Sequence, residues 1–147
     1  PVAVEERAVL SVEPGPAMSL RGGLGEEALG DLAGAAAERV GVDGIMVMPA
    51  LVYSSKPHET AAHFRSVATA TDLPIMVYNN PPIYKNDVTP DILATLTDCD
   101  NIVCFKDSSG DTRRFVDLRN TVGDRFVLFA GLDDVVVLVP QVRGTVS

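Results

Sequence analysis

A lysine and a tyrosine at the ends of two apolar segments are the residues of this sequence best suited to chemistry. Lys106 continues the apolar run that begins at Ile102, and Tyr78 ends the run that begins at Leu73. An amine shielded from water is favoured in its neutral form, which attacks carbonyl carbons. A phenol can relay protons. If the two segments are neighbouring strands, they offer a nucleophile and a proton relay to one cavity.

The same residue types also have ordinary structural explanations, which residue type alone leaves open. A lysine at a strand end usually reaches out to water, and a strand tyrosine is more often part of a core or an interface. Residues 107–111 are typical of the N-cap and turn chemistry that precedes a helix. Arg113 and Arg114 are suited to anion binding near a helix N-terminus, although a solvated helix face is the simpler expectation.

The pattern of apolar runs predicts the scaffold for these residues. Strands are expected at residues 44–48, 74–78, 102–106 and 126–130. Each run is continuous, which is typical of parallel strands covered on both faces. Helices are expected at residues 59–70, from the Thr89 N-cap and Pro90 onward, and at residues 112–122 before Gly123. Successive strand-helix units predict a (β/α)8 barrel or a doubly wound sheet, with functional side chains at the carboxyl ends of the strands.

The N-terminal part of the chain is richer in residues that break helices and strands. Residues 14–16 read Pro-Gly-Pro, and several glycines up to residue 34 penalise a continuous helix. An amphipathic pair of turns at residues 4–10 and an Ala-rich helix at residues 26–40 are the expectations here. We therefore divide the chain into a poorly matching segment, 1–40, and a strand-helix part, 41–147. Because the chain opens on Pro1 and stops inside an expected strand at 144–147, we expect a fragment.

Composition excludes several functional classes. The 147 residues include 20 acidic and 12 basic side chains, for a net charge of -8, which argues against a nucleic-acid partner. The apolar runs are too short to span a bilayer and no secretory signal is visible, so we expect no membrane partner and a cytoplasmic location. Cys99 and Cys104 lack the spacing of metal ligands, which argues against zinc and against a disulfide scaffold.

Two motifs carry a family resemblance. The sequence YNNP at 78–81 and FKDSSGD at 105–111 is similar to the dihydrodipicolinate synthase and N-acetylneuraminate lyase superfamily. The resemblance extends over about residues 41–134 in the family's order. It implies an α/β fold, a (β/α)8 TIM barrel, of which this chain is an incomplete portion: about strands four to seven, with part of the last.

The resemblance also implies an activity. Lys106 would form a Schiff base with a small 2-oxo acid or a cyclic imine acid, and Tyr78 would move protons to and from the adduct. Asn80, Ser108 and Gly131 would line the substrate cavity. No cofactor and no metal are implied, and the family's members are commonly homotetramers.

Departures from the family pattern bear on which substrate and reaction are expected. The family's Gly-Thr-Thr-Gly-Glu loop has no counterpart in residues 1–34, and Ile83 stands where dihydrodipicolinate synthases carry an arginine, five residues after the tyrosine. The motifs look most like those of enzymes that deaminate 1-pyrroline-4-hydroxy-2-carboxylate. The alternatives are a sugar-acid dehydratase or aldolase of the same family, and an inactive barrel segment with a structural or interaction role.

Overall fold

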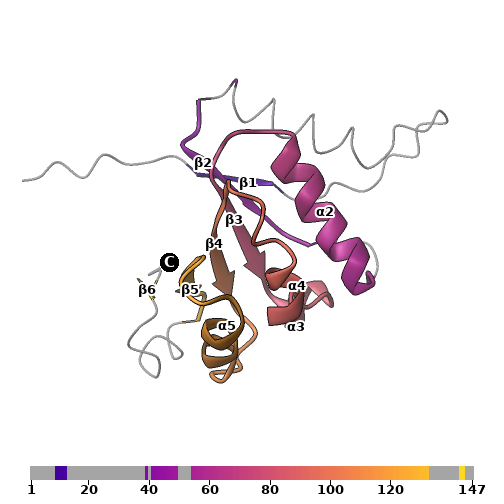
Figure 1. Ribbon diagram of the computed structural model, residues 1–147, viewed down its shortest axis with the longest axis vertical. Helices are drawn as coiled ribbons and strands as arrows, with labels where there is room; N and C mark the ends of the chain where they lie inside the picture. The colour runs from indigo at the N-terminus through magenta and orange to yellow at the C-terminus, as the bar shows by residue number, and fades with distance from the viewer. Residues whose placement is uncertain (1–8, 13–38, 40, 50–53, 133–142, 145–147) are drawn as a thin grey trace, which may run out of the picture.

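The described part of the structure is one parallel sheet with helices between its strands. The computed structural model describes residues 9–12, 39, 41–49, 54–132 and 143–144 (Figure 1). The strands lie in the order β1-β2-β3-β4-β5-β6. They are β1 (Val9–Val12), β2 (Gly44–Val47), β3 (Ile75–Asn79), β4 (Ile102–Asp107), β5 (Val127–Ala130) and β6 (Arg143–Gly144). Every neighbouring pair is parallel, as the continuous apolar runs predict.

Two of the helix ends carry residues typical of helix caps. The helices are α2 (Pro57–Thr69), α3 (Pro81–Tyr84), α4 (Pro90–Ala94) and α5 (Arg114–Val122). Thr89 caps α4, since its hydroxyl accepts a hydrogen bond from the Ile92 amide at 3.4 Å. Gly123, with φ of 58°, ends α5 in a conformation that L side chains rarely adopt. The three predicted helices correspond to α2, α4 and α5, and each begins within two residues of its predicted start. The short helix α3 is an addition that the sequence pattern did not indicate.

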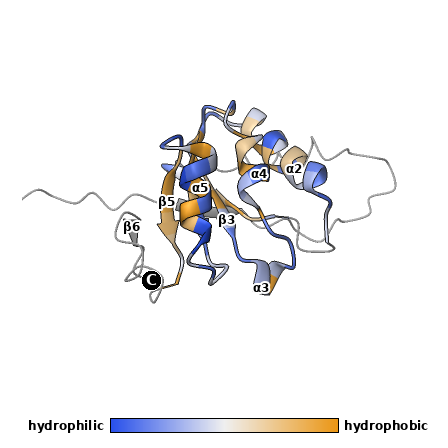
Figure 2. Ribbon diagram, turned by 60° about the horizontal axis from the view of Figure 1, so that its bottom comes forward, coloured by the Kyte–Doolittle hydropathy of each residue, from blue (hydrophilic) through white to orange (hydrophobic). Residues whose placement is uncertain are grey.

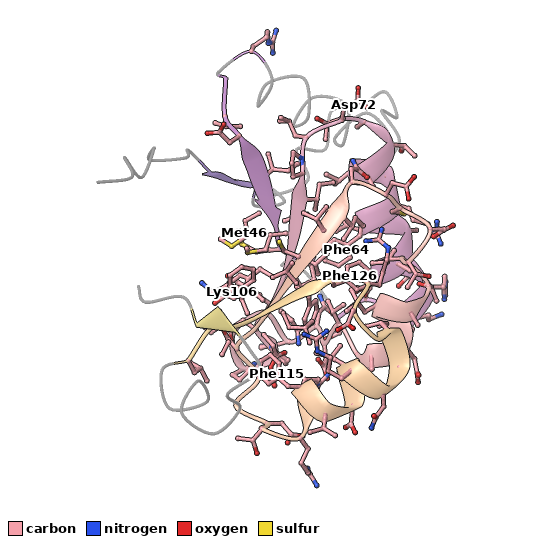
Figure 3. All side chains as sticks on the ribbon, turned by 60° about the vertical axis from the view of Figure 1, so that its left-hand side comes forward. Met46, Phe64, Asp72, Lys106, Phe115 and Phe126 are labelled. Carbon is pink, nitrogen blue, oxygen red and sulfur yellow. The ribbon has the colours of Figure 1, made fainter. Side chains whose placement is uncertain are left out.

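One face of the sheet packs against the helices and forms the core. Figure 2 shows β5 as hydrophobic and α5 as mixed, as expected for a helix with one buried side. Figure 3 places Phe64, Phe115 and Phe126 between the sheet and the helices, and each is at most 1% exposed. We call this the helix face of the sheet. Its other strand residues include Ile45, Val47, Ile75, Val77, Phe105 and Leu128.

Two expectations for the chain ends meet the structure only in part. Residues 9 and 10 belong to β1, paired in parallel with β2, so the predicted pair of turns at 4–10 is wrong there. Local pattern missed a four-residue strand whose partner, β2, lies more than thirty residues further along the chain. The predicted helix at 26–40 lies outside the described residues apart from Arg39, and of the predicted strand 144–147 only Gly144 is described, in β6. No helix in the described ranges is long and apolar enough to cross a membrane.

Candidate active site

Tyr78 and Lys106 lie side by side on neighbouring strands. They are paired residues of β3 and β4, and the Lys106 Nζ atom is 5.1 Å from the centroid of the Tyr78 ring. Both side chains are half-buried. Figure 3 shows Lys106 and Met46 on the side of the sheet away from the helices, which we call the inner face. The amine and the phenol therefore share one face, as expected from the strand ends.

A bulge in β4 decides which way Lys106 points. Ile75 pairs with Ile102, whereas Met76 pairs with Cys104, so Val103 is an extra residue in β4. An extra residue reverses the alternation of side chains beyond it. With regular pairing, Lys106 would lie opposite Asn79 and would point toward the helices. The bulge turns the amine onto the inner face.

The hydroxyl group of Tyr78 receives two hydrogen bonds. The Asn80 Nδ2 atom donates to the Tyr78 Oη atom at 3.0 Å, and the Ser108 hydroxyl donates to it at 3.3 Å. Both donors are buried, Asn80 at 8% and Ser108 at 3% exposure. Because a phenol oxygen has two acceptor sites and one proton, this arrangement leaves the Tyr78 proton for a third group.

Gly131 packs its backbone against Ser108 and Lys106, where there is no room for a side chain. Its amide donates to the Asp107 carbonyl oxygen at 2.7 Å. A Cβ atom at Gly131 would lie 2.0 Å from the Ser108 Oγ atom and 3.2 Å from the Lys106 Cε atom. The first distance is far below van der Waals contact, so any side chain here would displace Ser108.

A polar network behind the sheet involves residues that sequence analysis missed. Asn79 and Asp107 follow Tyr78 and Lys106, and they lie on the helix face, where the Asn79 Nδ2 atom donates to the Asp107 Oδ1 atom at 2.8 Å. Asn79 also donates to Asp87 at 3.0 Å, and Asp87 accepts from Arg114 at 2.7 Å. The signal in the sequence was alternation: a polar residue directly after each candidate belongs on the opposite face.

Arg114 corrects an expectation. Its side chain is only 12% exposed and is bound to Asp87, so it does not lie on a solvated helix face. Burial lowers the pKa of Arg114, but the hydrogen bond and charge of Asp87, with the charges of Asp107 and Asp111, outweigh burial and raise the pKa overall. Arg113 is exposed and pairs with Asp111, as expected of a solvated arginine. The turn chemistry predicted at 107–111 is also present, because Asp107 accepts a hydrogen bond from the Ser109 amide at 3.1 Å.

One layer below Lys106, the inner face is apolar. Met46, Met76, Cys104 and Val127 are in register across four strands. Burial raises the pKa of the Cys104 thiol. Cys104 and Cys99 are free thiols, and the described residues hold no group of three side chains placed to bind a metal.

A separate groove of about 560 Å3 lies between α2 and α4. Its lining includes His58, Ala61, Arg65 and Ile92. None of the five predicted site residues lines this groove. Its helices pack on the opposite face of the sheet from Lys106, so it is distinct from the cluster around Tyr78.

The structure thus brings all five predicted site residues into one cluster at the ends of β3, β4 and β5. Tyr78 and Lys106 are neighbours on the inner face, while Asn80 and Ser108 bind the Tyr78 hydroxyl and Gly131 packs against Ser108 and Lys106. Their roles in binding or catalysis stay predictions.

Comparisons with known proteins identify the family to which the chain is similar. The chain matches the model of the dihydrodipicolinate synthetase family over residues 25–145. The 4-hydroxy-tetrahydrodipicolinate synthase of Desulforudis audaxviator is 35% identical over 111 residues, which cover 74% of this chain and 37% of that relative. The corresponding protein of Prochlorococcus marinus strain NATL2A is 39% identical over 101 residues, covering 67% of this chain and 32% of its own length.

Solved structures of dihydrodipicolinate synthases share the fold of this chain. Dihydrodipicolinate synthase from Cyanidioschyzon merolae, with lysine bound, superposes with a TM-score of 0.72 at 29% identity, covering 84% of this chain and 42% of that one. The 4-hydroxy-tetrahydrodipicolinate synthase of Methylacidiphilum fumariolicum SolV gives a TM-score of 0.76 at 27% identity, with 82% and 41% covered. The predicted incomplete (β/α)8 barrel is confirmed. The chain spans about 37% of the length of the first curated relatives it matches, and the boundary at residue 40 stays a prediction.

Proposed function

Because this chain belongs to the dihydrodipicolinate synthetase family, we propose that it carries the imine-forming centre of a lysine-dependent lyase that acts on a small 2-oxo acid. The observation that carries the proposal is the placement of the Lys106 amine beside the Tyr78 phenol on the inner face. The relatives named above are synthases, and their activity comes to this chain only as part of the proposal.

Lys106 is the proposed nucleophile. Its Nζ atom attacks the carbonyl carbon of the 2-oxo acid, and the carbonyl oxygen leaves as water once it has received protons. The product is a protonated imine. Its positive nitrogen draws electrons from the bonds at the neighbouring carbon, which is what a cleavage or elimination requires.

Tyr78 is the proposed proton relay. Since Asn80 and Ser108 both donate to its oxygen, its own proton is directed to a third group, and the adduct on Lys106 is the group within reach. Asn80 and Ser108 were expected to line the substrate cavity. We propose that they also hold the phenol, and that Gly131 keeps the space that the lysine chain needs.

The finer substrate assignment depends on Ile83. This residue is 67% exposed in α3, five residues after Tyr78. The family's dihydrodipicolinate synthases carry an arginine there, a planar cation suited to a second, dicarboxylic substrate. An apolar residue favours a single substrate, and we propose the deaminase chemistry implied by the motifs.

Lys106 would attack the ring imine carbon of 1-pyrroline-4-hydroxy-2-carboxylate and open the ring. Elimination of the 4-hydroxyl group as water would leave an unsaturated terminal amine, which tautomerises to a terminal imine. One water would hydrolyse this terminal imine with release of ammonia, and a second water would hydrolyse the enzyme imine to give 2-oxoglutarate semialdehyde and free Lys106.

Two measurements separate the general proposal from the finer one. Lys106→Met in the complete protein should abolish turnover, whereas Lys85→Met, at an exposed lysine, should leave turnover unchanged. Full turnover by Lys106→Met would overturn the general proposal. Ammonia release from the pyrroline tests the finer one, and its absence alongside good turnover of a deoxy sugar acid or sialic acid would favour the dehydratase or aldolase alternative.

A further inference from the structure

The helix face carries a second pair of side chains at the level of the candidate active site. Asn79 and Asp107 are paired residues of β3 and β4, one step beyond Tyr78 and Lys106. Asn79 is 0% exposed and Asp107 is 3% exposed. The two are joined by the 2.8 Å hydrogen bond from the Asn79 Nδ2 atom to the Asp107 Oδ1 atom. One pair therefore lies directly behind the other, across the thickness of the sheet.

Both N–H groups and the oxygen of the Asn79 amide take part in hydrogen bonds. Its second N–H donates to Asp87 at 3.0 Å, and its Oδ1 atom accepts from the Val88 amide at 2.9 Å. Arg114 holds the far oxygen of Asp87 at 2.7 Å. A buried polar network that is fully satisfied fixes one arrangement, because any shift leaves a group without a partner. The network thus joins the strand ends to the segment before α4 and to the first residue of α5.

This network distinguishes between two registers of β4. In the observed register, Val103 is bulged and Asn79 lies opposite Asp107. In the regular register, Asn79 would lie opposite Lys106, and Asp107 would move away from the amide that binds it. That alternative would turn the Asp107 carboxylate away from Asn79 and leave one N–H of the fully buried Asn79 amide without this acceptor, which is unfavourable. It would also turn Lys106 toward the helices.

We propose that Asn79 and Asp107 are positioning residues that select the bulged register of β4, and so hold the Lys106 amine beside the Tyr78 phenol. The inference rests on the proposed function. Neither residue touches the reacting atoms. They act through the backbone, since the Ser108 amide donates to the Asn79 carbonyl oxygen at 2.8 Å and the Gly131 amide donates to the Asp107 carbonyl oxygen at 2.7 Å.

The test is a double-mutant cycle in the complete protein. Asn79→Ala should lower kcat by about 100-fold, the scale expected when reacting groups are misplaced by about 1 Å. If Asn79 acts by placing the Lys106–Tyr78 pair, removal of the Tyr78 hydroxyl should then matter less. Tyr78→Phe is expected to cost about 100-fold in the unsubstituted protein but at most about 10-fold in the Asn79→Ala background.

Asn101→Ala is the matched control. Asn101 also makes two amide hydrogen bonds, to the Ala68 carbonyl at 2.9 Å and the Thr71 carbonyl at 2.7 Å, but at the other end of β4. Its loss should lower the unfolding temperature without changing kcat, and its effect should add to that of Tyr78→Phe. Asp107→Asn, which keeps an acceptor for the Asn79 amide, should recover most of the kcat that Asp107→Ala loses.

The outcomes separate the two proposals. Additive losses for Asn79→Ala and Tyr78→Phe, in a protein that still forms the imine, would overturn the positioning role and leave the proposed function intact. Failure of the unsubstituted protein to form an imine on Lys106 would overturn both. If Asn79→Ala does not fold, Asp87→Ala removes the network's outer bond at a side chain that is 37% exposed, and should show the same non-additivity with a smaller loss.

Discussion

Lys106 and Tyr78 are in direct register on β4 and β3, with the lysine Nζ atom 5.1 Å from the tyrosine ring centroid. Two features of the fold produce this relationship. The bulge at Val103 turns the lysine onto the inner face, and the pairing of Asn79 with Asp107 holds the strands in that register. The arrangement gives a nucleophile and a proton relay a common approach to one carbonyl carbon.

The hydroxyl of Tyr78 should be needed for turnover more than for adduct formation. Tyr78→Phe keeps the ring beside Lys106 and removes only the group that Asn80 and Ser108 bind. We expect kcat to fall by roughly 100-fold, the usual scale for a lost acid or base, while the imine still forms. Steady-state kinetics together with imine trapping provide the measurement. A variant with the full turnover number would remove Tyr78 from the mechanism.

Gly131 should not tolerate a side chain. The Cβ atom of Gly131→Ala would lie 2.0 Å from the Ser108 hydroxyl oxygen, so the hydroxyl that donates to Tyr78 must move. We expect the free energy of unfolding to fall by about 1–3 kcal/mol, as for other overpacked sites. Adding Ser108→Ala should recover part of that loss. Denaturant unfolding of the single and double variants checks this, and no recovery would show that the contact is not the cause.

The thiol of Cys104 should react slowly at neutral pH. Burial raises its pKa above the ordinary value of 9.0, so the reactive thiolate is scarce at pH 7 and increases as the pH rises through and beyond 9. Iodoacetamide labelling followed by peptide mass spectrometry should show this rise for the folded protein. Urea-unfolded protein is the control and should react faster at the same pH. Rapid labelling of folded protein at pH 7 would contradict the expectation.

The cap of α4 should contribute measurably to stability. Thr89→Ala removes the hydroxyl that accepts from the Ile92 amide, and we expect a loss of about 1 kcal/mol in the free energy of unfolding. Thr121→Ala, at an exposed threonine inside α5, is the control and should cost less, because alanine has the higher helix propensity. Equal losses for the two variants would argue against capping by Thr89.

Much of the scaffold could be predicted because the signals are local. Continuous apolar runs located β2, β3, β4 and β5 to within one residue at each end, and Thr89 and Gly123 marked helix ends. Functional groups of parallel sheets lie at the carboxyl ends of the strands, and this rule predicted that Tyr78, Lys106 and Gly131 lie close together.

The remaining features depend on pairings that local pattern does not encode. Val9–Val12 is a short strand defined by its partner β2. The bulge at Val103 appears only when β4 is aligned with β3. Arg114 was expected on a solvated face because its partner, Asp87, lies 27 residues earlier and across the helix layer. Ionic and amide networks between distant segments follow from the fold rather than from the spacing of residues along the chain.

The most direct test of the central claim is borohydride reduction in the presence of pyruvate or the natural 2-oxo acid, followed by peptide mapping. Reduction converts an imine into a stable secondary amine on the lysine that formed it. The geometry predicts a modified peptide containing Lys106, with no modification at the exposed lysines Lys56 and Lys85. Modification of Lys56 or Lys85 instead, or of no lysine in the folded complete protein, would contradict the account and favour a structural or interaction role for this barrel segment.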